Sequence, residues 1–134
     1  MTPEAERSLE KAENCLATAH AELAINLSSE AGRNAYLAAF HAARAFIFER
    51  TGKVARRHET VHREFHRLAK DEPAIDKSFP PFLSQGYNMK AIAYYDTTPG
   101  AFVSREDAAA AIETATRFVE CIRRILTPSS GPTP

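Results

Sequence analysis

The fold of this chain is decided by one run of residues: Ala35-Tyr36-Leu37-Ala38-Ala39-Phe40-His41-Ala42-Ala43-Arg44-Ala45. Apolar side chains recur in it at helical spacing on more than one face, so a helix here is apolar around most of its circumference. The run predicts a long helix over about residues 30–51, which Ser28-Ser29-Glu30 caps and Gly52 ends. We expect this helix to be the most buried one, because few of its faces suit water.

The same spacing predicts helices on both sides of this run. Thr2 and Pro3 form a start signal, with a capping hydroxyl followed by proline at the first helical position. Ser104, three residues before Asp107, is a variant of the capping box and opens the last helix. The other helices are expected over about residues 3–27, 59–70 and 81–95.

No stretch of the chain alternates apolar and polar residues as a half-buried strand does, and no hairpin signal is present. Abundant alanine favours helices and lets their axes approach closely. We therefore predict an all-α fold, an antiparallel up-and-down bundle of four long helices plus a short extra helix. The bundle is expected to cover residues 1–126, and the tail at 127–134, rich in Pro, Ser and Gly, to be disordered.

Composition is that of an ordinary globular protein. The 134 residues suffice for one core, and a formal net charge of zero gives no overall attraction to nucleic acid or an anionic membrane. Residues 1–30 hold six acidic residues against two basic ones, a local charge of −4. Residues 53–70 hold six basic residues against two acidic ones, a local charge of +4, so a basic patch is expected there.

The location follows from what the chain lacks. Cys15 and Cys121 have no metal-type spacing and are expected as small core residues. No segment is apolar and long enough to span a bilayer, and the acidic, polar N-terminus is unlike a signal peptide. We therefore expect a cytoplasmic protein.

Three regularly spaced histidines lie in the basic stretch Arg56-Arg57-His58-Glu59-Thr60-Val61-His62-Arg63-Glu64-Phe65-His66-Arg67. His58, His62 and His66 are spaced so that a helix places them in a stripe on one face. Histidine moves protons near neutral pH, and arginine binds phosphate bidentately. The pattern indicates a site for a phosphate-bearing ligand or nucleic acid; the alternative is a solvated basic face.

Cleavage of RNA without a metal ion needs a base for the 2′-hydroxyl, an acid for the leaving oxygen and a cation for the phosphorane charge. His58 or His62 could supply the proton transfers, and Arg56 or Arg57 the positive charge. In a dimer the two copies could divide the acid and base roles. The further residues expected to bind the ligand from this stretch are Arg63, His66 and Arg67.

Zinc binding is the rival use of the stripe, since two histidines four residues apart can share an ion with Glu59 or Asp96 as a third ligand. A third histidine on one straight helix lies too far along to share that ion easily, and no HExxH motif is present. The favoured interpretation therefore has no metal and no cofactor.

The sequence allows two interpretations of His41 and Tyr36 on the central helix, as core residues or as residues that line a ligand pocket. A histidine among alanines and phenylalanines is typical of a core residue whose ring nitrogens have hydrogen-bond partners, here Tyr94 or Tyr95. If the centre of the bundle is open, His41 would instead line a ligand pocket.

Arg44 is expected to face inward or a dimer partner, with an acidic group of the first helix as its counter-charge.

Four features follow one another in a specific order along the chain. They are the run at residues 35–45, Gly52 followed by His58, the run Asn88-Met89-Lys90-Ala91-Ile92-Ala93-Tyr94-Tyr95, and a last helix containing Ala115 and Phe118-Val119. Over residues 5–126 this order resembles the HEPN superfamily, in particular its small stand-alone prokaryotic members related to HEPN toxins. The resemblance implies a helical bundle that dimerises. It also implies a metal-independent ribonuclease with an Arg-x4-6-His motif at the dimer interface.

The resemblance also points to individual residues. Arg57 or Arg56, paired with His62, satisfies the spacing of the motif. In the toxins we would expect the motif near the start of the late helix, around Lys90. There the similar branch tends to read Arg-x-x-Ala-Asp-Tyr, whereas this chain has Lys90 and Tyr94, with Tyr95 and then Asp96 beside them. The ligand-binding residues expected outside the histidine stretch are His41, Tyr36, Lys90, Tyr95 and Asp96.

Together these observations predict a homodimeric HEPN-domain protein that acts on RNA or nucleotides as a metal-independent endoribonuclease. The resemblance implies the toxin half of a toxin–antitoxin pair, with a minimal nucleotidyltransferase as its partner. The alternative is a non-catalytic HEPN module that binds nucleotides or docks on such a partner.

Overall fold

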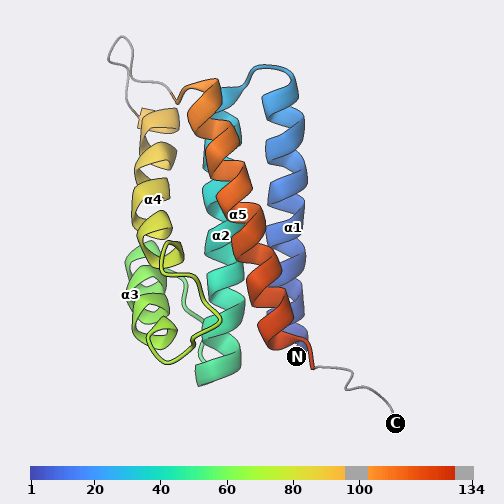
Figure 1. The fold of residues 1–134 in the computed structure, drawn as a ribbon, viewed down its shortest axis with the longest axis vertical. Coiled ribbons are helices and arrows are strands. Elements are labelled where there is room, and N and C mark those ends of the chain that lie inside the picture. Colours follow the sequence, from blue (N-terminus) through green and yellow to red (C-terminus); the bar gives the residue numbers. More distant parts are fainter. Residues whose placement is uncertain (96–102, 129–134) are drawn as a thin grey trace.

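A computed structural model describes residues 1–95 and 103–128, with side chains for residues 1–87 and 103–128. The described chain forms five helices and confirms the predicted all-α bundle. Figure 1 shows α2 between α1 and α4, with α5 lying across it and the short α3 below α4, alongside the lower half of α2. The helices are α1 (Pro3–Ala24), α2 (Ser28–Thr51), α3 (His58–Ala69), α4 (Phe79–Tyr95) and α5 (Arg105–Leu126).

The central helix α2 packs against each of the other four helices. Thirteen of its 24 residues are buried, against nine of 22 in α5, so it is the most buried of the helices whose side chains are described throughout. Most of these buried residues are alanines, so the backbones of its neighbours can approach closely and the few large side chains fill what space remains. The few large side chains of α2 therefore determine which residues of the other helices contact it.

Stacked phenylalanines tie α3, α4 and α5 together at one level. The Phe118 ring is fully buried, with its centroid 5.0 Å from that of Phe65 and 4.8 Å from that of Phe79. The Phe65 ring in turn meets Phe46 of α2 edge-on at 5.7 Å. Because Phe65 lies beside Phe46 while His58 lies beside Tyr36, α3 runs alongside α2 in the same direction.

The helix ends follow the capping signals, with one correction. Thr2 and Ser104 accept hydrogen bonds from the backbone N–H groups of Ala5 and Asp107, as expected for caps. The expected serine cap of α2 is wrong: its N-cap is Leu27, and no side chain caps it. The Ser29 hydroxyl instead accepts a hydrogen bond from the N–H of Val103, which holds the start of α5 against the start of α2.

The structure describes only part of the predicted tail at residues 127–134. Residues 129–134 of the expected disordered tail lie outside the described residues. Cys121 is buried and Cys15 half-buried, as expected for small core residues. Among the described helices, none combines the length and apolarity that crossing a membrane requires.

Replacing Phe118 by alanine should lower the free energy of unfolding by about 3–5 kcal/mol, because it removes a buried ring that packs three helices together. Urea unfolding followed by circular dichroism measures the change. The control is Glu120→Ala, an exposed residue of the same helix, which should stay within about 0.5 kcal/mol of the parent. A Phe118→Ala effect as small as the control's would contradict this account of the core.

Candidate functional site

One buried hydroxyl joins two of the three histidines. The Tyr36 oxygen lies 2.6 Å from Nδ1 of His58 and 2.8 Å from Nε2 of His62. Tyr36 is fully buried in the middle of α2, whereas the two histidines occupy the first and second turns of α3. A buried phenol needs hydrogen-bond partners, and residues 22 and 26 positions further along the chain supply them.

Aromatic rings enclose this group, which we call the Tyr36 cluster: Tyr36, Phe40, His58, His62 and Tyr87. The Phe40 and His58 rings stack with centroids 4.4 Å apart and planes 24° apart. The Tyr87 ring of α4 lies 5.0 Å from that of His58 and meets that of His62 edge-on at 5.9 Å. Tyr87 is 42% exposed, so the cluster runs from the buried phenol out to the surface.

A glycine makes the close approach of α4 to α2 possible. A Cβ atom added at Gly86 would lie 2.7 Å from Cδ1 and 3.1 Å from Cβ of Tyr36. Because Gly86 has no side chain, α4 can contact the buried Tyr36 ring directly. This contact keeps the Tyr36 phenol near the start of α3.

Proton positions in the cluster are linked. The phenol has one proton, so it donates to one imidazole and accepts an N–H from the other. Either arrangement leaves one histidine with an N–H, and the other with a lone pair, on its second ring nitrogen. Burial, with a smaller effect of Tyr87, raises the pKa of Tyr36, so the phenol stays neutral. Burial also lowers the pKa of His62, which favours the neutral ring.

His41 lies beside the cluster on α2, with its ring edge-on to Phe40 at 5.5 Å. Its Nδ1 is buried and has no hydrogen-bond partner in the described part of the chain. The expected bond to Tyr94 or Tyr95 concerns side chains outside that part. Burial first, then the charges of Arg44, Lys11 and His58, lower the pKa of His41 to about 4, so the ring is neutral at physiological pH.

The arginines lie around one edge of the cluster. Arg56 and Arg57 are exposed and directly precede α3, whose N-terminus has no side-chain cap. The charge of Glu4 on α1 acts on Arg44, as expected for an acidic counter-charge from the first helix, and the Arg44 Nε also donates to the oxygen of Ala55 at 2.9 Å. Burial and then the charge of Arg56 lower the pKa of Arg44, so positive charge is concentrated here.

The sequence model of the HEPN domain family matches residues 5–125, which is almost the whole chain. The chain belongs to the HEPN domain family. This confirms the family indicated by the sequence, and a search of curated proteins found no match.

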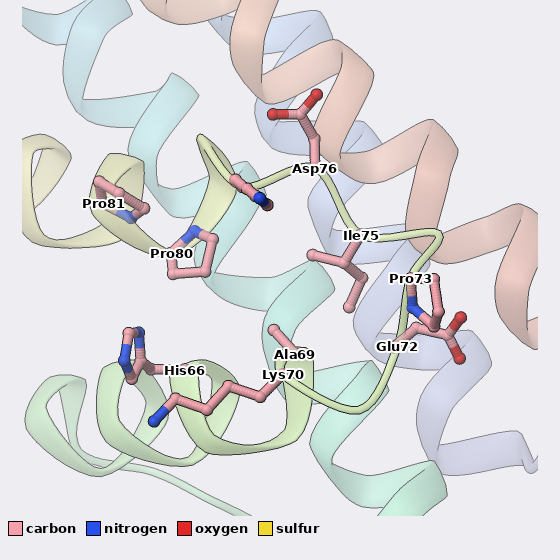
Figure 2. A pocket seen from close by; sticks show the side chains of 10 residues that line it. His66, Ala69, Lys70, Glu72, Pro73, Ile75, Asp76, Pro80 and Pro81 are labelled. Carbon is pink, nitrogen blue, oxygen red and sulfur yellow. The ribbon is translucent and has the colours of Figure 1, made fainter.

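The rest of the histidine stretch of this HEPN domain lies apart from the cluster. His66 is exposed and lines a groove that shares no residue with the Tyr36 cluster (Figure 2). Arg63 is exposed, and Arg67 forms an exposed ion pair with Glu64, with N–O distances of 3.0 and 3.1 Å. The expected single stripe is therefore divided: two histidines meet Tyr36 and the third does not.

Three other candidate residues of the HEPN domain cannot be placed. Lys90 and Tyr95 lie in α4, but their side chains are outside the described residues, as is the whole of Asp96. Among the described residues, no three His, Cys, Asp or Glu side chains form a group that could hold a metal ion.

Sequence reasoning missed three neighbours of the cluster. Phe40 was expected only as a core residue, and neither Tyr87 nor Gly86 was singled out. Gly86 did carry a usable signal, because a glycine inside a helical pattern often marks a close approach of another segment. Its neighbour Tyr87 would then have been a residue to examine.

Replacing Gly86 by alanine should lower the free energy of unfolding although alanine is the better helix former. The added Cβ must displace a buried ring, at about 1–3 kcal/mol, against a gain in helix propensity of about 1 kcal/mol. Urea unfolding of this variant beside Gln85→Ala, its exposed neighbour, separates the two effects. A Gly86→Ala variant more stable than the parent would show that Tyr36 is not pressed by α4.

His41 should make stability depend on pH. Its pKa is about 4 in the folded chain but near 6.5 when unfolded, so between these values the unfolded chain binds more protons. The stabilisation is complete above pH 6.5 and is lost as the pH falls towards 4. In urea unfolding at a series of pH values, His41→Leu should lose less stability over this range, by at most about 1.4 kcal/mol per pH unit and less where water screens the ring.

The exposed His20→Ala provides the control for general effects of removing a histidine. Identical pH dependence in the parent and His41→Leu would mean that His41 is solvated and titrates freely.

Proposed function

We propose that this HEPN domain binds RNA at the Tyr36 cluster and cleaves it without a metal ion. The observation that carries the proposal is the hydroxyl shared by His58 and His62, which joins two proton-transfer groups into one unit. Membership of the HEPN family supports the general assignment.

The linked tautomers suit the two proton transfers of the reaction. The histidine with the free lone pair takes the proton of the 2′-hydroxyl as that oxygen attacks the phosphorus atom. The P–O5′ bond breaks, and the leaving oxygen takes a proton from the other histidine. The products are a 2′,3′-cyclic phosphate and a 5′-hydroxyl. A proton then passes from the first ring to the phenol while the phenol proton passes to the second ring. Both rings are then neutral with their tautomers exchanged, and exchange of the outer ring protons with water returns the starting arrangement.

The edge of the cluster suits a phosphodiester. Arg56 and Arg57 precede the uncapped N-terminus of α3, where backbone N–H groups and the helix dipole attract anions. This charge would bind the scissile phosphate beside His58, the first residue of the helix, and stabilise the extra negative charge of the phosphorane. The exposed Tyr87 ring offers a surface on which a base can stack.

We further propose that the protein is the toxin half of a cytoplasmic toxin–antitoxin pair with a minimal nucleotidyltransferase, and that it acts as a homodimer. The resemblance to stand-alone HEPN toxins supports this. Because the other four helices of its own chain pack against α2, we expect the dimer interface to lie mainly on other faces.

The second candidate is a HEPN module that binds the phosphate without cleaving it. One observation favours it: both histidines already commit one ring nitrogen to a buried phenol, a contact that also stabilises the fold. The two candidates share the binding site and differ in whether the second ring nitrogens do chemistry.

Cleavage of a labelled single-stranded RNA in excess EDTA distinguishes them. The parent should form cyclic-phosphate ends, and His58→Ala and His62→Ala should each lower the rate about 10²–10⁴-fold, as loss of a general acid or base does. Tyr36→Phe keeps the ring but removes the proton path, so its rate should also fall. His20→Ala, an exposed histidine on α1, serves as the matched control.

Fluorescence anisotropy with the same RNA tests binding separately. RNA bound by the parent but not by Arg57→Ala, without cleavage, would favour the binding module. Neither binding nor cleavage by folded protein would refute both candidates.

A further inference from the structure

A concave surface lies apart from the Tyr36 cluster, between the C-terminal half of α3, the following loop and the first turn of α4 (Figure 2). It has a volume of about 560 Å³, within the usual range of ligand sites. We call it the proline groove, after Pro73, Pro80 and Pro81 in its wall. Because it shares no residue with the Tyr36 cluster, the proposed RNA chemistry does not use it.

The wall of the proline groove is apolar and stiff. Ile75 is buried at its back, and Pro80 faces the His66 ring across it in Figure 2. Proline has no backbone N–H and a fixed φ angle, so these positions present carbon atoms in a single conformation. Such a wall suits an apolar side chain.

The loop that forms the groove is held from behind. The Ala74 carbonyl accepts a hydrogen bond from the thiol of Cys121 on α5, at 3.3 Å. Glu72 forms an ion pair with Arg50 of α2, with an N–O distance of 2.7 Å. A surface that is already ordered loses little conformational entropy when a partner binds.

The acidic residues of the groove already have partners. Besides Arg50, Glu72 accepts a hydrogen bond from the N–H of Ala74 at 3.3 Å. Asp76 accepts two from Ser78, from the N–H at 2.8 Å and from the hydroxyl at 2.6 Å, and these lower its pKa. Glu72 is thus paired with a cation of its own chain, and the hydrogen bonds from Ser78 use part of the accepting capacity of Asp76.

The basic residues of the groove have no such partners. Lys70, Lys77 and His66 line it, and the side chains of these three residues make no hydrogen bond or ion pair with the rest of the described chain. The groove therefore pairs an apolar wall with nitrogen donors that are available to a ligand. A complementary ligand carries an apolar group beside negative charge.

We propose that the proline groove binds a short acidic segment of a partner protein, in which an apolar side chain enters between the prolines and neighbouring carboxylates pair with Lys70 and Lys77. A peptide is favoured over nucleic acid because unpaired bases bind largely by stacking on aromatic rings. Among the described residues that line the groove there is no Phe or Tyr, and Pro80 faces the ring of His66.

Selection from a phage-displayed random-peptide library on the full-length protein tests the proposal. Selected peptides should combine acidic with apolar residues. By fluorescence anisotropy, a synthetic copy of one should bind Lys70→Glu and Lys77→Glu at least about tenfold more weakly than the parent. Lys11→Glu, an equal charge change on exposed α1, should bind like the parent. Circular dichroism checks that each variant is folded.

Three results would overturn the proposal: no enrichment over beads alone, enriched peptides without acidic residues, or equal binding by all variants. A single-stranded RNA that displaces the peptide and itself loses affinity in Lys70→Glu would assign the groove to nucleic acid. His58→Ala should bind the peptide like the parent, so failure of the ribonuclease proposal would leave this result unchanged.

Discussion

The structure depends on a phenol that is buried at the centre of the bundle. Alanines bring four helices close around α2, which leaves the Tyr36 hydroxyl out of reach of water, and an unpaired hydroxyl there would be costly. The first two turns of α3 satisfy it with His58 and His62. The chain must therefore return from the end of α2 to its middle before α3 begins. The hydrogen bond from Arg44 to the Ala55 carbonyl secures that return.

Burial makes the hydrogen bonds of Tyr36 important for stability, and it also shifts the pKa values of the groups that form them. It lowers the pKa of His62 and raises that of Tyr36, so a neutral imidazole faces a neutral phenol. A neutral imidazole has the lone pair that a general base needs. A buried structural contact alone does not require an exposed aromatic rim or a basic edge. Tyr87 on the rim and Arg56 and Arg57 on the edge are what make this cluster a candidate site rather than only a core.

Local patterns in the sequence predicted the helices, because periodicity and caps are properties of neighbouring residues. The bundle, the burial of α2 and the caps at Thr2 and Ser104 followed from them. The hydrogen bonds of Tyr36 did not, since they join residues 22 and 26 positions apart and depend on the path of the loop between two helices. For the same reason Tyr36 could be named as a candidate, but the residues that it would meet could not.

The division of the histidine stripe follows from the geometry of one helix. Four residues advance an α-helix about 40° beyond a full turn, so His66 points about 80° away from His58. On a short helix packed into a bundle, that rotation carries a side chain from one groove to the next. The buried Val61 and Phe65 fix the rotation of α3, so His58 and His62 must face Tyr36 while His66 faces the proline groove. A regular spacing in sequence thus gives two chemically different surfaces at fixed positions on one rigid element.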